Sequence, residues 1–458
     1  MKKYNSHNQI SQKTVRNVIA NSFLNCSQRA ITYLLIFFVL GCASTRDFEP
    51  SMADPGIPKI TSSKVTITKT HSPLSSLPQI KALVNKIQAS KIATSSIALS
   101  RSVNISANSN SGVAPDTKGG LESYADASIV AEKPIYDGDR ISLRTQLSEI
   151  ETQSLLVGLE LALNEIVAEI TEQQLTIGLT DEAIKVIDAS LADYEQNKPM
   201  LETLVNAGVV QKLEFLDLRQ KIQGIEASRH AFDTKQRQAE TILKTKYAVI
   251  SSIKTPSFEK IKNINLEQLD GLQLKELKLK EQNLRLNRQL KRADKSWGVT
   301  FATTATVKTN DNDPQLFSGL KFSLPIYDGG AIDAALASLD EQIEALTAEI
   351  DAYEVSKKTA KSTWSQNIQA YAGALEINTA QIALVLDRQI DLDRQLSAGR
   401  VKLDQVVSNK LTLLDLSLKK IELKQTAVAQ AFEVIRLFGA GCKISDVCGE
   451  INDLLESL

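Results

Sequence analysis

The sequence predicts a mainly α-helical protein with a smaller β-sheet part, built from two copies of one long structural unit. One short segment, Pro-Ile-Tyr-Asp-Gly, occurs at 134–138 and again at 325–329. Period-two alternation of apolar residues precedes each copy, and apolar residues spaced three and four apart follow it. Residues 326–458 contain no Pro, which favours long helices because Pro disrupts the interior of a helix.

The composition argues against several classes of function. The chain has 458 residues with 53 Lys plus Arg and 54 Asp plus Glu, so it lacks the basic surplus of a nucleic-acid-binding protein. It has three His and four Cys, without ligand spacing among them, so we expect no metal site. It carries no nucleophile elbow, phosphate-binding loop or dinucleotide fingerprint. We therefore expect neither an enzyme nor a bound cofactor.

The N-terminus has the pattern of a secretory signal. Basic residues and a short apolar run precede Cys42, and the run is too short to span a bilayer comfortably. The residues that end in Cys42 resemble a bacterial lipobox, which implies removal of 1–41 and a lipid on Cys42. In that resemblance Ala43 permits sorting to the outer membrane. The alternative is an uncleaved anchor helix. Residues 42–79 are rich in Ser, Thr and Pro and are expected to form a flexible tether.

Two landmarks show that the remainder of the chain is an internal duplication. Asp137 and Asp328 lie 191 residues apart (328 − 137), and Gly208 and Gly399 lie 191 residues apart (399 − 208). The common offset indicates a tandem repeat without insertions between the landmarks. The period is far longer than that of solenoid repeats, so each unit is the size of a domain.

Each repeat is expected to begin with a strand hairpin. We predict strands at about 92–107, 121–132, 297–308 and 316–325, with loops at 108–120 and 310–314. Strands of this length, with small and polar residues on one face, suit a membrane barrel, although a half-buried soluble sheet shows the same alternation. Four strands cannot close a barrel, and an open edge is not tolerated in lipid. The membrane interpretation therefore requires several chains to pool their strands.

A long helix is expected after each strand hairpin. The stretches 137–207 and 328–398 have 71 residues each, and as helices they would be roughly 100 Å long. This length implies coiled-coil-type packing. Pro199 lies inside the first stretch and is expected to kink or break it near its far end.

Each long helix is expected to turn back on itself. Gly208 and Gly399 follow the two helical stretches, and a residue in the left-handed conformation at that position reverses the chain. Return helices are predicted at roughly 213–251 and 403–438. Each repeat would then read strand, loop, strand, long helix, turn, return helix.

Over about residues 80–438, this order of elements resembles the TolC-like outer membrane efflux proteins. The resemblance implies a homotrimer in which four strands from each chain form one twelve-stranded β-barrel in outer membrane lipid. The helices would form a hollow α-barrel in the periplasm. The domain division that follows is repeat 1 at 80–250 with its helical hairpin at 137–250, an equatorial linker at 251–275, repeat 2 at 276–438 with its helical hairpin at 328–438, and a C-terminal tail at 439–458.

The resemblance places a change of chain direction where each sheet meets its helix. The matching junction residues are Pro134, Asp137, Gly138, Pro325, Asp328 and Gly329. An Asp at this point can accept hydrogen bonds from the free N–H groups of the first helical turn. These residues are therefore interpreted as determinants of the fold rather than of chemistry.

The helical turns match the periplasmic tips of the family, which meet a periplasmic adaptor (membrane fusion) protein. The tip residues are Ala207, Gly208, Val209, Ala398, Gly399 and Arg400. A Gly lets two backbones approach closely, as an adaptor contact would require. The turn itself also requires Gly, so a purely structural role is the alternative.

Charges beside the tips are candidates for the entrance of a pore. Glu214 matches an acidic position of the family, whereas the second repeat has Gln405 at the equivalent position, with Asp404 beside it. This departure weakens the case for a full acidic ring. Three-fold symmetry would still triple each charge in a narrow pore. Solvated helix charges are the alternative for Glu214 and Asp404.

Two cysteines lie near the C-terminus. Cys442 and Cys448 could pair as a disulfide in an oxidising periplasm. A metal site would need more ligands than this region offers. Residues 253–271, which join the repeats, are expected to pack with the C-terminus as a collar around the helices.

Two functional hypotheses follow. The first is a passive exit channel, docked through the adaptor to an inner-membrane transporter of the ABC or RND type, for type I secretion or drug efflux. The absence of catalytic motifs is compatible with it. The second is a lipid-anchored periplasmic coiled-coil scaffold or adaptor without a pore. Strand length, the loop-bearing hairpins and the repeated Pro-Ile-Tyr-Asp-Gly segment favour the first.

Overall fold

A computed structural model describes residues 73–115, 121–248, 253–264, 266, 271–308 and 311–458. The chain separates into two units, Met1–Thr66 and Ile67–Leu458, and all described residues belong to the second. The predicted signal segment, the predicted lipidation site Cys42 and most of the predicted tether lie outside the described residues.

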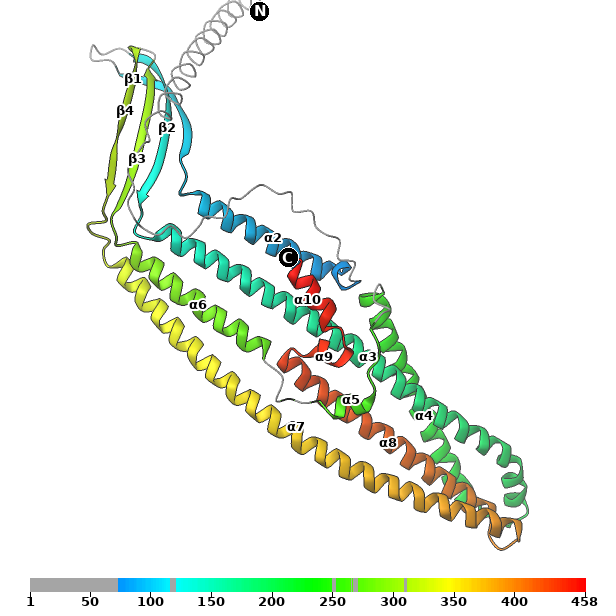
Figure 1. The fold of residues 1–458 in the computed structure, drawn as a ribbon. Helices are drawn as coiled ribbons and strands as arrows, with labels where there is room; N and C mark the ends of the chain where they lie inside the picture. The colour runs from blue at the N-terminus through cyan, green and yellow to red at the C-terminus, as the bar shows by residue number, and fades with distance from the viewer. Residues whose placement is uncertain (1–72, 116–120, 249–252, 265, 267–270, 309–310) are drawn as a thin grey trace, which may run out of the picture. The chain divides into compact units, whose positions relative to one another are not determined.

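The described chain consists of long helices and one four-stranded sheet (Figure 1). The elements are, in order, η1 (Pro73–Ser76), α2 (Pro78–Leu99), β1 (Asn104–Pro115), β2 (Leu121–Tyr136), α3 (Arg140–Asn206), α4 (Lys212–Tyr247), α5 (Phe258–Lys262), α6 (Leu272–Ala293), β3 (Gly298–Lys308), β4 (Asp311–Ser323), α7 (Ala331–Ser397), α8 (Leu403–Phe438), α9 (Gly441–Ser445) and α10 (Cys448–Glu456). Among these helices, none combines the length and apolar character needed to cross a bilayer.

The internal duplication is confirmed by the lengths of the elements. The helices α2 and α6, which precede the strand hairpins, have 22 residues each. The long helices α3 and α7 have 67 residues each, and the return helices α4 and α8 have 36 each. Each repeat therefore contains a lead helix, two strands, a long helix and a return helix.

The first strand begins later in the chain than predicted. The first strand was expected at about 92–107, but residues 78–99 form α2 and β1 begins at Asn104. Residues 92–99 contain Ile with Ser, Thr and Ala, a composition that is compatible with either a strand or a helix. Ile80 and Ile87, earlier in the same helix, pack in the core and stabilise the helix. The lead helices α2 and α6 were not predicted.

The loops between paired strands are shorter than their composition indicated. The strand β1 continues to Pro115 and β4 begins at Asp311, inside the predicted loops at 108–120 and 310–314. Both strands are at an edge of the sheet, where Pro is compatible with strand structure because its missing N–H is not needed by a neighbour.

Pro199 does not break α3, which runs without interruption to Asn206. The predicted break of the helix at Pro199 is therefore wrong. The carbonyl of Pro199 accepts a hydrogen bond of 2.9 Å from the hydroxyl of Thr203, one turn further on.

The four strands form one antiparallel sheet in the order β1-β2-β3-β4. The pairing of β2 with β3 joins the two repeats, with Ile129 opposite Ala305. The register shifts between Pro134 and Tyr136, where β2 ends and the chain turns into α3. The outer edges of the sheet are formed by β1 and β4.

Three clusters of buried apolar side chains hold the helices together. One lies around Phe432 of α8 and includes residues of α3, α5 and α9. A second lies around Leu163 of α3 and includes residues of α2 and α10. The third lies around Tyr194 and joins α3 and α4 to α8, so it ties the two helical hairpins to each other near their turns.

The segment between the repeats packs with the C-terminal segment. Ile253 shares a buried cluster with Val447 of the C-terminal segment. Lys260 of α5 forms an ion pair of 2.5 Å with Asp446. Both segments lie on α3 and α8, the helices that carry the core.

Candidate functional site

The sheet has one face that is almost free of charge. In the register of the strands, the large apolar residues of β4 on this face, Leu316, Leu320 and Phe322, stand opposite Ala305, Phe301 and Val299 of β3. The face continues on β2 through Ile129 and Ala131 and on β1 through Ala107 and Ile105. Among the side chains of this face that the structure describes, the one charge is Lys133, near the helical end of β2. All three β4 residues are more than half exposed in the single chain.

The opposite face is polar. Asp126 and Glu132 of β2, Thr304 of β3 and Lys321 of β4 belong to it by the same alternation. It also contains apolar residues, among them Phe317, so it is mixed rather than purely hydrophilic. A sheet with an uncharged face and a polar face suits a boundary between lipid and water.

The two edges of the sheet are open. Among the described residues, no strand pairs with the outer side of β1 or of β4. Each edge therefore presents a row of backbone N–H and C=O groups that can pair with another strand.

The junctions between sheet and helix are built alike in the two repeats. Asp137 accepts a hydrogen bond of 2.6 Å from the backbone N–H of Ile141, and Asp328 accepts one of 2.9 Å from that of Ile332. Both carboxylates thus satisfy a donor in the first helical turn, as expected from their sequence position. Gly138 and Gly329 have φ of 67° and 65°, a left-handed conformation that Gly adopts without strain.

The residue after each junction Gly also adopts positive φ. It is Asp139 with φ 64° in the first repeat and Gly330 with φ 82° in the second. Asp tolerates this conformation better than most residues with a side chain, because its short polar side chain can hydrogen-bond locally. The hydrogen bonds to Asp328 from Ile332 and from Gly330 lower the pKa of the Asp328 carboxyl below its usual value.

The helical turns reverse the chain through the predicted glycines. Gly208 has φ of 74° and Gly399 has φ of 68°. In the first turn the N–H of Val209 donates to the carbonyl of Leu204, and in the second the N–H of Arg400 donates to that of Gln395, so both helices end in a Schellman motif.

The tip residues are open to solvent in the single chain. Ala207, Val209, Ala398 and Arg400 are all exposed, and an added Cβ at either turn Gly would meet no atom within 4 Å. The turns therefore present free backbone that another protein could contact.

The two candidate pore charges lie in different surroundings. Glu214 is exposed in the first turn of α4. Asp404 is half-buried in the first turn of α8, and its Oδ1 is buried without a hydrogen-bond partner in the described part of the chain. The structure thus places both near the turns but gives them no shared site.

Sequence reasoning missed the polar contacts inside the second helical hairpin. The amide of Asn409 donates to the carbonyl oxygen of the Gln389 side chain over 2.9 Å, and Gln389 donates to Asp393. Beside Asn409, Lys410 forms an ion pair of 2.8 Å with Asp193 of α3, in the first helical hairpin. The sequence signal for these contacts is an Asn or Gln, here Asn409 and Gln389, at a position of the helical repeat that is otherwise apolar.

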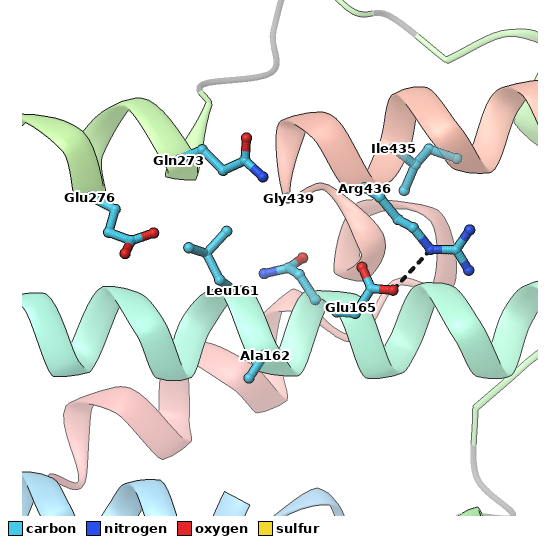
Figure 2. Close-up of a pocket in the computed structure, with 9 residues that line it drawn as sticks. Leu161, Ala162, Glu165, Gln273, Glu276, Ile435, Arg436 and Gly439 are labelled. Atoms are coloured by element: carbon cyan, nitrogen blue, oxygen red, sulfur yellow. Dashed lines mark hydrogen bonds and ion pairs between the residues drawn. The ribbon is translucent and has the colours of Figure 1, made fainter. Parts of the chain in front are cut away.

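One pocket of about 270 Å³ lies between α3, α6 and the end of α8. Figure 2 shows Glu165 of α3 and Gln273 and Glu276 of α6 around it, with Arg436 of α8 pointing toward Glu165. Arg436 donates to Glu165 over 2.9 Å and to Glu172 over 2.5 Å, so its charge is already matched. The pocket was not predicted from the sequence.

The C-terminal segment is fixed to α3. Cys442 and Cys448 form a disulfide with Cα atoms 4.8 Å apart. The N–H of Cys442 donates to the side chain of Asn164, and the hydroxyls of Ser445 and Thr171 are 2.7 Å apart. Within the described ranges, no group of three or more His, Cys, Asp and Glu side chains is arranged to hold a metal ion.

Comparison with solved structures finds this fold in bacterial outer membrane proteins. VceC of Vibrio cholerae matches with a TM-score of 0.68 and 11% identity, over 80% of this chain and 94% of VceC. The CmeC outer membrane channel of Campylobacter jejuni matches with a TM-score of 0.67 and 10% identity, over 84% of this chain and 88% of CmeC. The MtrE outer membrane channel of Neisseria gonorrhoeae matches with a TM-score of 0.64 and 13% identity, over 82% of this chain and 88% of MtrE.

No protein-family model and no curated protein matches the sequence. The identities to the solved structures are low, so these matches establish the fold. The chain has the fold of the TolC-like outer membrane channels, and the resemblance found in the sequence is confirmed at that level.

Proposed function

We propose that this chain is one subunit of a passive homotrimeric exit channel in the outer membrane. The observation that carries the proposal is the sheet, which has an almost uncharged face, a polar face and two open edges. Two of the solved structures with this fold, CmeC and MtrE, are outer membrane channels, which supports the same role here.

The open edges are the reason why several copies are needed. In lipid every backbone N–H and C=O must be paired, so a four-stranded sheet cannot enter the membrane with two bare edges. Because the strands alternate in direction, β4 of one copy is antiparallel to β1 of a copy placed beside it. Pairing these edges around a ring closes a barrel without reversing any strand.

A hollow barrel sets a minimum number of copies. Two copies would supply eight strands, and the interior of a barrel of about eight strands is filled by side chains. Three copies supply twelve strands, as in the family that the chain resembles, and leave a hollow. The face with Leu316, Leu320 and Phe322 would meet lipid, and the face with Asp126 and Thr304 would line the water-filled interior.

The helical part would serve as the periplasmic conduit. Its hairpin turns at Gly208 and Gly399 are exposed and carry backbone that a periplasmic adaptor could contact. The adaptor would connect the channel to an inner-membrane transporter of the ABC or RND type. Glu214 and Asp404 lie close to these turns and would place acidic charge at the entrance of the conduit.

A lipid on Cys42 would hold the chain to the membrane before and after the barrel closes. A lipid anchor attaches a protein to the membrane but does not insert it, so the barrel would provide the insertion. Replacing Cys42 by Ser should abolish incorporation of radiolabelled palmitate. It should leave the purified, assembled protein able to conduct.

The proposal is tested by single-channel recording of the full-length protein extracted in detergent and added to planar bilayers. The expected result is discrete conductance steps from a preparation that remains oligomeric. A protein that is extracted as a monomer, and that gives no conductance, would contradict the channel and support the lipid-anchored scaffold without a pore.

A further inference from the structure

The junction between sheet and helix occurs twice in the chain, once in each repeat. Another segment of the chain packs against it in the first repeat but not in the second. At the first junction the ring of Tyr136 lies 4.6 Å, centroid to centroid, from that of Trp297. A Cβ added at Gly138 would lie 2.6 Å from the Cβ of Ser296. The connection from α6 to β3, which contains Ser296 and Trp297, therefore sits directly on the first junction.

The second junction is bare. Ile326 and Tyr327 are 92% and 90% exposed, whereas Tyr136, the equivalent of Tyr327, is 41% exposed. A Cβ added at Gly329 would meet no atom within 4 Å. The Pro-Ile-Tyr-Asp-Gly segment and its left-handed Gly are the same at both junctions, and the main difference in packing is the segment that covers them.

The repeat identifies the segment that would cover the second junction. The lead helices begin at Pro78 and Leu272, an offset of 194 residues (272 − 78), and β1 and β3 begin with the same offset (298 − 104). This register makes Ser102 the equivalent of Ser296, and Val103 the equivalent of Trp297. Both Ser102 and Val103 are exposed.

The lead helix α2 has a matching bare face. Ile92 and Leu99, seven residues apart on one side of α2, are 71% and 60% exposed. Their equivalents in α6 are Leu286, which is half-buried, and Ala293, which is 8% exposed. The helix α6 packs between α3 and α7, whereas the apolar side of α2 that carries Ile92 and Leu99 is uncovered in the described structure.

One chain cannot bring its own bare surfaces together. Ser102 and Val103 precede β1, and Ile326 and Tyr327 follow β4, so they lie at opposite edges of the sheet (Figure 1). A neighbouring copy with its β1 beside this β4 would bring them together.

We infer that the connection from α2 to β1 of one copy seats on the second junction of the next copy, with Ser102 over Gly329 and Val103 against Tyr327. The contact reproduces between chains what Ser296 and Trp297 make within one chain. It is head-to-tail, because the two surfaces differ, and such a contact closes into a ring when the rotation permits. The inference rests on the proposed function, since it requires a ring of copies joined edge to edge.

The inference is tested by a cysteine pair, Val103→Cys with Tyr327→Cys, in the full-length protein in native membranes, treated with a short bifunctional thiol reagent. Because both side chains are exposed in the single chain, the substitutions leave the fold intact. The expected result is covalent dimers and trimers on a denaturing gel, in several-fold higher yield than in either single variant.

Two control variants fix the interpretation. Tyr136→Cys with Trp297→Cys should cross-link within one chain and give no change in subunit number, because this contact is intramolecular. Val103→Cys with Ser338→Cys should cross-link poorly, because Ser338 lies 11 residues (338 − 327) beyond Tyr327, the last seven of them (338 − 331) along α7, which is roughly 10 Å of helix. Equal yields from this pair and the test pair would overturn the inference.

The outcomes separate the contact from the channel. An oligomer that conducts but does not cross-link through Val103 and Tyr327 overturns the inferred contact and leaves the channel standing. A cross-linked oligomer that gives no conductance supports the contact and overturns the channel. A protein that is monomeric in native membranes overturns both.

Discussion

At the residue scale, Gly441 is a point where the C-terminal segment packs tightly against the backbone of α3. A Cβ added there would lie 2.0 Å from the carbonyl oxygen of Asn164, a backbone atom of α3 that cannot move aside cheaply. Gly449, in the same C-terminal segment, has open space at the equivalent point. The two glycines therefore separate the effect of a close contact from the effect of Gly itself.

Gly441→Ala should lower the free energy of unfolding by about 2 kcal/mol or more, because the clash forces α9 away from α3. Gly449→Ala should be neutral or slightly stabilising, since Ala favours a helix over Gly. Urea unfolding followed by far-ultraviolet circular dichroism measures both. Equal effects of the two substitutions would show that the contact with Asn164 is not tight.

Asp328 makes the stability of the second junction depend on pH. Hydrogen bonds from the backbone N–H groups of Ile332 and Gly330 favour the charged carboxylate and hold its pKa below the usual 3.8. Because the folded-state pKa is the lower one, the stabilisation is present above the unfolded value and is lost as the pH falls through the folded value. Asp328→Asn should therefore lower the thermal midpoint at neutral pH, and the difference from the wild type should shrink as the pH falls below 3.8. A difference that stays constant from neutral pH into that range would contradict this account.

Residue-level features were predictable where the signal is local. Asp137 and Asp328 were expected to cap helices, and Gly208 and Gly399 to reverse them, because each role depends on a few neighbouring residues. The contact of Gly441 with α3 depends on residues far apart in the chain, and no local pattern reports it.

At the element scale, α8 is bound to α3 by a series of ion pairs. Lys410 pairs with Asp193 and Lys424 with Glu182, and Arg436 pairs with both Glu165 and Glu172. Arg436 is the least replaceable, because its planar guanidinium contacts two carboxylates at once.

Arg436→Met should lower the free energy of unfolding by about 1 kcal/mol, a value discounted for partial solvent screening. Glu172 would keep its charge at a largely covered position without the partner that matches it. Arg394→Met is the matched control, because Arg394 is exposed and its ion pair, at 3.5 Å, is with Asp391 of its own helix, so its effect should be near zero. An Arg436 variant as stable as the Arg394 variant would show that the pairs along α8 do not hold the hairpins together.

The two faces of the sheet predict opposite responses to added charge. Leu316→Lys places a charge on the face assigned to lipid, near the middle of β4, where a Lys near the middle of the bilayer costs about 2–4 kcal/mol. Thr304→Lys places the same charge on the face assigned to water and should be tolerated. The fraction of protein that resists extraction by carbonate measures the difference, with both variants made in a Cys42→Ser background so that no lipid on Cys42 holds them to the membrane. Equal membrane retention of both variants would contradict the assignment of the faces.

Element types were predictable where periodicity is long. In the 67-residue helices α3 and α7, apolar residues recur three and four positions apart, a pattern that is typical of a helix and not of a strand. The lead helix α2 was taken in part for a strand, because a short run of Ile with Ser, Thr and Ala fits both periods. Its buried partners on α3 and α10 decide the outcome, and these are not visible in the local sequence.

At the scale of the whole molecule, the duplication explains why the first repeat is covered by the second and why the outer strand and junction of the second repeat are exposed. The first repeat meets the second through β2 and β3 and through Tyr136 and Trp297, whereas among the described residues nothing covers the outer side of the second repeat in the same way. Its outer strand and its junction are therefore left bare. The repeat was evident in the sequence, but the exposed Ile326 and Tyr327 required the structure, because the sequence of the two junctions is the same.

The central claim is that three copies share one closed barrel, and native mass spectrometry of the full-length protein released from detergent tests it most directly. The account predicts a single assembly with the mass of three chains, with no smaller species until the detergent micelle is stripped under denaturing conditions. A protein that is recovered intact and folded with the mass of one chain would contradict it, because one chain supplies four strands with two open edges.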